Sequence, residues 1–311
     1  MSKTAGIIII GDEVLNGKVV DTNSSYLCKQ FHALGIRVCK ISTIPDQTDI
    51  IQSEVKLFSN SYDIVITTGG IGPTHDDVTY EGVASAFDVS VRRDEQMANI
   101  FSDYLKTNPD PAAEKLVKIP TSADVIMATN LEYPLVSGLH YYPVVKMRNV
   151  FCLPGVPKYM ETIFPALALE YFHNSRTMYF SRTIYLTVDE IHVVTVLNEL
   201  VQKFADSVAF GSYPLVTDSK MGSVKAKIIV ESTSMAGSLE AEKVFISRIH
   251  PSWISYPDIQ VPDLAFIQRL YTIETELSDP LKTSHQVRFS KYLIHCDCDV
   301  NSRSIHFSDH R

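Results

Sequence analysis

The amino-terminal part of the chain alternates short apolar runs with helical patterns. Ile7–Ile10 is an unbroken run of β-branched residues, which is typical of a strand buried on both faces. Helix-spaced apolar residues follow it, and Gly35 is placed to end that helix. Strand and helix patterns then alternate through Val38–Ile44, Ile50–Phe58, Asp63–Thr67, Val78–Phe87 and Asn149–Leu153. This order predicts an α/β fold with a doubly wound, mostly parallel sheet.

The rest of the chain predicts further parts. A helix is expected from Pro157 to Phe172, because proline fits the first helical turn, and residues 173–180 form a polar connection. Beyond it, a small α+β module is predicted from patterns at Thr183–Thr187, Glu190–Phe204, Val208–Gly211, Val224–Val230 and Leu239–Ile249. A last helical pattern covers Leu264–Leu277. We therefore expect domains at residues 1–175 and 180–277, and a divergent, poorly ordered tail at 278–311.

Composition narrows the class of protein. Of 311 residues, 45% are hydrophobic and 21% are charged, as in ordinary globular chains. The formal charge of -8, from 28 basic and 36 acidic residues, argues against nucleic acid or an anionic membrane as a partner. The longest apolar run is far shorter than the ~18 residues that a membrane span needs. A strand as early as Ile7 leaves no room for a signal peptide, so we expect a cytoplasmic protein.

The five cysteines are too few and too scattered for a disulfide framework. Cys28, Cys39 and Cys152 lie within apolar patterns and are expected to be buried free thiols. Cys296 and Cys298 lie near the end of the chain among several histidines, which invites a zinc interpretation. Their Cys-x-Cys spacing is not the usual one for zinc, so we favour a divergent terminus.

Three loops directly follow predicted strands, and ligands bind outside the carboxyl ends of strands in doubly wound sheets. The first loop runs from Gly11 to Gly17 and continues to Asp21-Thr22-Asn23. Its adjacent carboxylates, Asp12 and Glu13, are oxygen ligands of the kind that divalent cations prefer. The alternative is a solvated acidic turn, with Thr22 or Asn23 capping the helix that follows.

The second loop, Thr67–Thr79, has three glycines in four positions, followed by Asp76 and Asp77. Glycines let a backbone approach a phosphate closely, and a helix N-terminus favours an anion. The carboxylates suit a metal that bridges phosphate oxygens. The loop has neither a Walker motif nor a G-x-G-x-x-G fingerprint. Two residues stay ambiguous: Asp77 is alternatively a helix cap, and His75 is either a solvated residue or a cation beside phosphate.

The third loop, Leu153–Pro157, is a rigid turn. It is either a pocket wall made of backbone amides or a simple helix start. Because the carboxyl ends of parallel strands lie at one edge of a sheet, we expect all three loops to converge there.

Together the three loops resemble the MoaB/Mog molybdopterin-binding family, which includes Mog-type adenylyltransferases and the amino-terminal halves of CinA and animal FAD synthase. The last is the most similar. Its motif GGIGPTHDDVT is matched letter for letter at Gly69–Thr79, and Phe210–Pro214 resembles its second subdomain. The resemblance covers about residues 4–256. It implies a three-layer MoaB/Mog-like domain with a smaller α+β subdomain, and a homo-oligomer, since the relatives form dimers or trimers.

The resemblance also implies an activity. The corresponding domain of FAD synthase and CinA is associated with metal-dependent hydrolysis of dinucleotides such as FAD or ADP-ribose, with Mg, Mn or Co as the divalent metal. Water attacks phosphorus in such a reaction, so cations and amide donors matter more than a covalent nucleophile. The residues expected to act in catalysis are Asp76, Asp77 and Asp12, and those expected to bind metal are Asp12, Glu13, Asp76 and Asp77. The residues expected to bind ribose or phosphate are Gly69, Gly70, Gly72, Thr74, Asp21, Asn23 and Gly155.

Departures from the family pattern narrow this expectation. Mog proteins carry a hydroxyl residue after the glycine pair, where this chain has Ile71, so molybdopterin adenylylation is not expected. The chain shows no Gly-Gly-Lys-Asp-like loop, so an FMN adenylyltransferase site is not expected, and neither is the deamidase half of CinA. Two other hypotheses stay open: a non-catalytic nucleotide- or molybdopterin-binding or regulatory module, and a fragment of a bifunctional FAD synthase.

Overall fold

The computed structural model describes residues 3–102, 111–129, 141–172, 178–215, 224–255, 297–298 and 305–306. The chain divides into two compact units, residues 1–255 and 256–311. In the second unit, the described strands β13 (Asp297–Cys298) and β14 (Ile305–His306) pair antiparallel. The helix predicted at 264–277 and the rest of the tail predicted at 278–311 lie outside the described residues, so the predicted division into domains stays a prediction.

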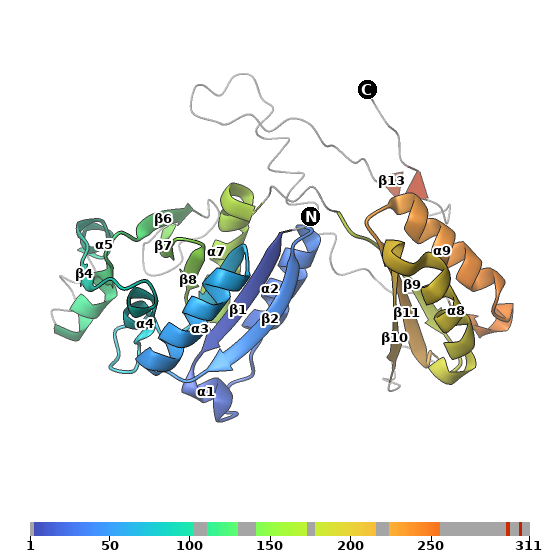
Figure 1. Cartoon of the computed structure of the whole chain (residues 1–311), viewed down its shortest axis with the longest axis horizontal. Coiled ribbons are helices and arrows are strands. Elements are labelled where there is room, and N and C mark those ends of the chain that lie inside the picture. Colours follow the sequence, from blue (N-terminus) through green and yellow to red (C-terminus); the bar gives the residue numbers. More distant parts are fainter. Residues whose placement is uncertain are drawn as a thin grey trace, which may run out of the picture. The chain divides into compact units, whose positions relative to one another are not determined.

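The first unit begins with an α/β domain built on a six-stranded sheet (Figure 1). In spatial order, its strands are β2 (Arg37–Ile44), β1 (Thr4–Ile10), β3 (Ile64–Thr68), β8 (Val150–Leu153), β7 (Tyr141–Met147) and β6 (Asp124–Thr129). The pairings among β2, β1, β3 and β8 are parallel, whereas β7 pairs antiparallel with both β8 and β6. The sheet is mixed, and the strands predicted from the sequence form its parallel part.

Helices cover both faces of this sheet (Figure 1). They are α2 (Asn23–Ala33), α3 (Thr48–Ser61), α4 (Thr79–Ala86), α5 (Glu95–Ile100) and α7 (Pro157–Leu167), and a π-helical turn at Ala168–Phe172 continues α7. The short helix α1 (Asp12–Leu15) has no buried residue and lies beyond the end of β1. Ile8 and Ile10 share a core with residues of α3 and α4, whereas Ile7 and Ile9 share one with residues of α2 and α7. Successive strand residues point to opposite faces, so β1 contributes to both cores. The predicted three-layer, doubly wound architecture is confirmed.

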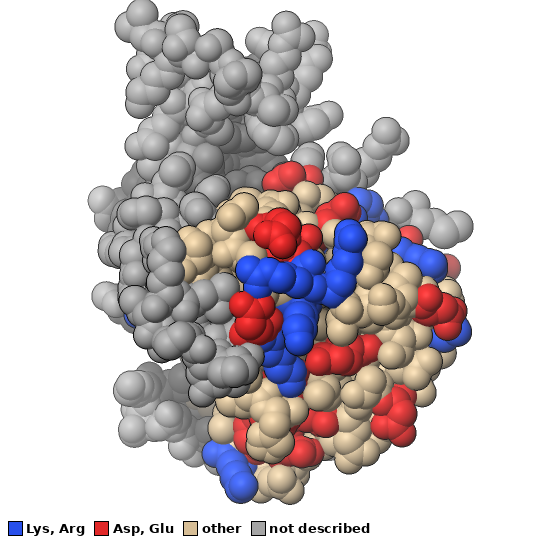
Figure 2. Space-filling view, turned by 90° about the vertical axis from the view of Figure 1, so that its left-hand side faces the viewer, with Lys and Arg blue, Asp and Glu red and all other residues tan. Residues whose placement is uncertain are grey.

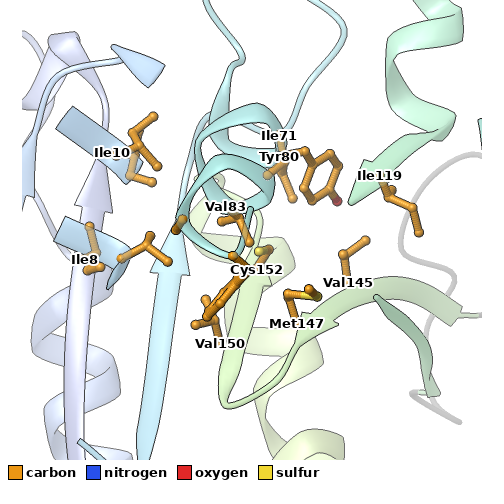
Figure 3. Packing of buried hydrophobic residues seen from close by; sticks show 14 of the residues in the cluster. Ile8, Ile10, Ile71, Tyr80, Val83, Ile119, Val145, Met147, Val150 and Cys152 are labelled. Atoms are coloured by element: carbon orange, nitrogen blue, oxygen red, sulfur yellow. The ribbon is translucent and has the colours of Figure 1, made fainter. Parts of the chain in front are cut away.

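Figure 3 shows the core on the α4 side of the sheet. Tyr80 and Val83 of α4 belong to one buried cluster with Val150 and Cys152 of β8. Ile71, which follows the glycine pair of the second loop, is buried in the same cluster. Ile71 thus anchors the second loop in the core. In the same cluster, burial raises the pKa of the Cys152 thiol to about 12, so this thiol stays protonated at neutral pH.

Several elements between α4 and β8 have no counterpart among the predicted ones. β4 (Val91–Arg93) pairs antiparallel with β5 (Lys118–Pro120), and the 3-10 helix η1 (Pro111–Val117) leads directly into β5. β6 and β7 were not predicted either. These elements extend the domain beyond the parallel strands.

A smaller α+β part follows at residues 178–255, as predicted (Figure 1). Its elements are β9 (Phe180–Leu186), η3 (Glu190–His192), α8 (Val194–Phe204), η4 (Ala205–Ser207), β10 (Val208–Pro214), β11 (Ala226–Ser232), α9 (Met235–Ser247), η5 (Pro251–Trp253) and β12 (Ile254–Ser255). The strands form an antiparallel sheet in the order β10-β11-β9-β12. A separate core joins the sheet to its helices through residues such as Ile228, Leu200 and Phe245.

Two local expectations have different outcomes. Gly35 has a φ of 69° immediately after the C-cap residue Leu34, which confirms the predicted end of α2. Cys152 is buried, but Cys28 is half-buried and Cys39 is exposed, so the expectation of three buried thiols is wrong for these two. Cys39 lies on β2, an edge strand of the sheet on which four of the eight residues are exposed. None of the described helices is long and apolar enough to cross a bilayer.

Charged side chains of both signs are interleaved on the surface. On the face shown in Figure 2, Lys and Arg side chains gather, with Asp and Glu side chains around them. Ion pairs of the α/β domain join such opposite charges, as between Arg93 and Glu95 and between Lys146 and Asp124.

Candidate functional site

The carboxyl ends of β1, β2, β3 and β8 lie at one edge of the sheet, and backbone hydrogen bonds join the loops that follow them. The N–H of Gly11, after β1, donates to the carbonyl of Ile44 at the end of β2 (3.1 Å). The N–H of Gly69, after β3, donates to the carbonyl of Leu153 at the end of β8 (3.1 Å). The predicted convergence of the three loops is confirmed, and the loop after β2 joins them.

Glycines let the second loop pack tightly against its neighbours. Gly69 has a φ of 107°, and a Cβ there would lie 2.0 Å from the carbonyl oxygen of Ile10. Gly70 has a φ of 63°, and a Cβ there would lie 2.3 Å from Oγ1 of Thr79. A Cβ on Gly155 would lie 3.1 Å from Cα of Gly69, so the third loop rests on the second. Backbone conformation and packing already require glycine at Gly69 and Gly70, before any ligand is considered.

Thr74 organises the two carboxylates of the second loop. Its N–H donates to Oδ2 of Asp77 (2.8 Å), and its hydroxyl donates to Oδ1 of Asp76 (2.6 Å) and also contacts Asp77. A Cβ on Gly72 would come within 2.7 Å of Oδ2 of Asp77. Helix α4 has no side-chain cap. The interpretation of Asp77 as a helix cap is therefore wrong, because this side chain closes the loop instead.

Asp76 is the exposed carboxylate of the loop. Its side chain is 61% exposed, and its Oδ1 lies 3.8 Å from Nδ1 of His75, which is almost fully exposed. The hydrogen bond from the Thr74 hydroxyl lowers the pKa of Asp76 below its usual value, and backbone hydrogen bonding lowers it further. Asp76 is therefore ionised at neutral pH and open to a ligand.

Asp46 is an acidic residue of this edge that the sequence interpretation missed. Its Oδ2 accepts a hydrogen bond from the N–H of Asp12 (2.9 Å). Burial raises the pKa of Asp46, and the negative charges of Glu13, Asp12 and Asp76 raise it as well, while the Asp12 N–H lowers it. Asp46, after β2, therefore lies within electrostatic reach of carboxylates from the loops after β1 and β3. Asp46 comes just after the end of β2, so the rule that selected the other loops would have found it.

The described residues do not form a metal cage made of protein alone. No group of three or more His, Cys, Asp or Glu side chains in the described part of the chain is arranged to hold a metal ion. Mg²⁺ is commonly bound by one or two carboxylates together with phosphate oxygens and water. The donors here fit that kind of site: they are hard carboxylate oxygens, and no ion pair between described residues involves Asp12, Glu13 or Asp46.

The start of α2 is capped by Asp21. Its Oδ1 accepts a hydrogen bond from the N–H of Ser24 (3.0 Å), and its Oδ2 contacts the Ser24 hydroxyl. The N-cap residue Thr22 makes no capping bond with its side chain. The prediction that a residue of this segment caps the helix is therefore confirmed, but the capping residue is Asp21 and not Thr22 or Asn23.

Asn23 joins three segments beneath the site. Its side chain is buried, and its Nδ2 donates to Oγ1 of Thr68 at the end of β3 and to the carbonyl of Gly155, both at 2.9 Å. Thr68 in turn donates to the carbonyl of Pro154 (2.9 Å). Oδ1 of Asn23 is buried and has no hydrogen-bond partner among the described residues. Asn23 thus connects α2, β3 and the third loop, with one acceptor left over.

Two tyrosines lie near the same edge. Tyr142 is at the start of β7, which runs antiparallel to β8, and Tyr159 is in the first turn of α7. Their ring centroids are 6.4 Å apart and the rings are tilted by 32°. Burial raises the pKa of Tyr142. Aromatic faces of this kind pack against planar rings.

Comparisons with known proteins agree with this organisation. Residues 6–174 match the family described as probable molybdopterin binding domain, and residues 178–258 match the one described as FAD synthase, middle domain. A probable FAD synthase of Caenorhabditis briggsae is 35% identical over 275 residues, which are 82% of this chain and 51% of that protein. A protein of Archaeoglobus fulgidus is 34% identical over 208 residues, 67% of this chain and 84% of that one.

Among solved structures, CinA of Thermoplasma acidophilum, a protein of unknown function, is 30% identical and covers 54% of this chain and 98% of its own, with a TM-score of 0.48. The chain spans about half the length of the probable FAD synthases that it matches.

Proposed function

The chain belongs to the MoaB/Mog family and joins this domain to an FAD synthase middle domain, and from this premise we propose that it hydrolyses the pyrophosphate of FAD, or of a related dinucleotide, with a divalent metal. The products from FAD would be FMN and AMP. Relatives of the chain carry the names probable FAD synthase and CinA-like protein. A flavin nucleotide is accordingly the first substrate to consider.

One observation carries the proposal: the Asp46 carboxyl accepts a hydrogen bond from the N–H of Asp12 (2.9 Å) and lies close enough to Asp12, Glu13 and Asp76 for their charges to raise its pKa. These four carboxylates come from three loops and repel one another. Perturbed titratable groups cluster at functional sites more often than elsewhere. A divalent cation bound with a pyrophosphate would offset this repulsion, so the geometry suits phosphoryl chemistry.

Each acidic residue has a separate role in this proposal. One or two of the carboxylates of Asp12, Glu13 and Asp76, together with pyrophosphate oxygens and water, would hold the metal, which, when bound, would polarise a phosphoryl oxygen. Asp76 is exposed and ionised, so its carboxylate would also accept a hydrogen bond from the attacking water and orient it. Asp46 would keep its hydrogen bond to the N–H of Asp12. Asp77 would keep the loop closed through Thr74.

The roles of the remaining predicted binding residues depend on the hydrogen bonds that they already make within the protein. The N–H of Gly69 is bonded to Leu153, so phosphate contacts would come from the amides of Gly70 and Gly72. Tyr159, whose ring packs against that of Tyr142, would offer its other face to a planar ring such as adenine or the flavin. Oδ1 of Asn23 only accepts hydrogen bonds and is buried, so Asn23 would support the site from beneath and would not bind a phosphate oxygen.

A second function, binding of a dinucleotide without cleavage, is favoured by a different observation. Thr74 already occupies the Asp77 carboxylate, and the described residues include no group of three metal-ligating side chains. A domain that only binds FAD would need neither a metal nor an oriented water.

The two functions are separated by product analysis. The purified chain would be incubated with FAD and, in parallel, with ADP-ribose, each with Mg²⁺, Mn²⁺ or Co²⁺ and with a chelator as control. Formation of FMN and AMP in equal amounts, only with metal, supports hydrolysis. Intact FAD together with measurable FAD binding supports the binding module and contradicts the proposed reaction.

A further inference from the structure

Lys115 connects the second loop to an element that is not part of the sheet edge. It lies in η1, and its Nζ donates to the carbonyl of Thr74 (2.7 Å) and to the carbonyl of His75 (3.3 Å). Its charge also lowers the pKa of Asp76, after the larger effects of the hydrogen bonds from the Thr74 side chain and from the backbone. A single cation therefore bonds to the backbone of the loop segment that carries Asp76 and Asp77.

Lys115 contacts the second loop at its exposed tip, between the two fixed ends of the loop. Both ends of the loop are fixed: Ile71 is buried in the core, and Thr79 donates to the carbonyls of Gly70 (N–H, 2.9 Å) and Gly69 (Oγ1, 2.9 Å). Between these ends, the side chains of Thr74, His75 and Asp76 are exposed. The bonds among Thr74, Asp76 and Asp77 hold the tip together, but they do not attach it to the rest of the domain. The two bonds from Lys115 do.

We propose that Lys115 is a positioning residue that fixes the tip of the second loop, and with it the carboxylates of Asp76 and Asp77, relative to the acidic edge formed by Asp12 and Asp46. Hydrogen bonds from a charged donor are the strong ones, and a carbonyl held by such a bond restricts the peptide on either side of it. The expected effect of Lys115 on catalysis rests on the proposed function, whereas the anchoring of the loop by Lys115 is independent of that function.

The kinetic test compares Lys115→Met with Lys115→Arg. Methionine keeps an unbranched stem and removes both bonds, whereas arginine can donate to both carbonyls. Since a misplacement of about 1 Å can cost about 10²-fold in rate, we expect kcat for FAD hydrolysis to fall by up to about 10²-fold in Lys115→Met, with KM nearly unchanged. Arginine is expected to restore most of the loss.

Lys118→Met is the matched control, because Lys118 is an exposed lysine on the adjoining strand β5. It is expected to keep the wild-type kcat. If Lys115 served only general stability, Lys115→Met would lower the free energy of unfolding but leave kcat of the folded protein unchanged. That result would overturn the proposal.

A second readout needs no substrate. Amide hydrogen exchange at Thr74 and Asp77, whose N–H groups are bonded within the tip, is expected to become about tenfold faster in Lys115→Met and to stay at the wild-type rate in Lys118→Met. Unchanged exchange in Lys115→Met would overturn the proposal. If the wild-type chain cleaves no dinucleotide, the proposed function fails, and this exchange measurement still decides the role of Lys115.

Discussion

The backbone N–H of Asp12 donates a hydrogen bond to the carboxylate of Asp46, at 2.9 Å, across the ends of the neighbouring strands β1 and β2. This bond holds two carboxyl groups of like charge close together, with the charges of Glu13 and Asp76 within reach. The free energy of unfolding therefore depends on whether the Asp46 carboxyl is ionised.

Asp46→Asn is expected to stabilise the protein at neutral pH. Because the pKa of Asp46 is raised by folding, mainly through burial, the folded state binds its proton more tightly than the unfolded chain. The stability that this proton binding contributes is lost as pH rises from the usual pKa of 3.8 through the raised value. Asparagine keeps an acceptor for the Asp12 N–H without the charge.

Urea unfolding in acid and at neutral pH would measure this effect. The difference in free energy of unfolding between Asp46→Asn and the wild type should grow as pH rises. Asp206→Asn, at an exposed position, provides the control and should show no such trend. A variant that is less stable than the wild type at neutral pH would contradict the account of Asp46.

Gly70→Ala is expected to destabilise the protein more than Gly17→Ala. Both glycines have a positive φ, 63° and 67°, so the cost of the left-handed conformation, about 1–2 kcal/mol, is shared. A Cβ on Gly17 would have nothing within 4 Å, whereas one on Gly70 would lie 2.3 Å from Oγ1 of Thr79. Overpacking should therefore add about 1–3 kcal/mol at Gly70. Equal losses in urea unfolding would show that the crowding at Gly70 is relieved without cost.

Asn23→Ala tests the junction beneath the site. The substitution removes both donated hydrogen bonds from a buried position, to Thr68 and to the carbonyl of Gly155, so a loss of about 1–3 kcal/mol is expected. Asn16→Ala, at an exposed asparagine, should stay within about 0.5 kcal/mol of the wild type. A free energy of unfolding of Asn23→Ala equal to that of Asn16→Ala would mean that the junction does not depend on Asn23.

Tyr159→Ala tests whether a planar ring binds at this edge. Stacking on an aromatic side chain is worth about 1–3 kcal/mol per base, so the Kd for FAD is expected to rise by about tenfold or more. Flavin fluorescence titration would measure it. Tyr213→Ala, at an exposed tyrosine of β10 in the smaller α+β part, should bind FAD like the wild type. Equal affinities in the two variants would exclude Tyr159 from the ligand site.

The parallel half of the sheet was predictable because its signals are local. Ile7–Ile10 is apolar enough to show a strand buried on both faces, and Gly35 ends the helix that follows it. β6 and the β4–β5 pair were missed because their strands pair with residues more distant in sequence, such as Asp124 with Lys146 and Arg93 with Lys118. β7 forms a tight hairpin with β8, but Pro143 interrupts its strand pattern. Cys39 was misplaced for a similar reason: its local pattern is apolar, but its exposure depends on β2 being an edge strand.

The part of the candidate site that lies in loops directly after strands could be predicted from the sequence. The glycines and aspartates of Gly69–Thr79 stand out from the sequence, and Asp46 could have been found by the same rule. Lys115 could not, because no local signal relates it to carbonyls some forty residues earlier in the chain. The assignment of the helix cap to Asp21 also required coordinates, since Asp21, Thr22 and Asn23 are all residue types that cap helices.

The central claim, that the acidic edge hydrolyses a dinucleotide pyrophosphate, is tested most directly by comparing the wild type with Asp76→Asn on FAD. Asparagine removes the exposed charge that would hold the metal and orient water. The account predicts that the wild type releases FMN and AMP in equal amounts only with a divalent metal, and that Asp76→Asn is slower by about 10²-fold or more, while Asp206→Asn matches the wild type. Wild-type turnover by Asp76→Asn, or FAD left intact by the wild type with every metal, would contradict it.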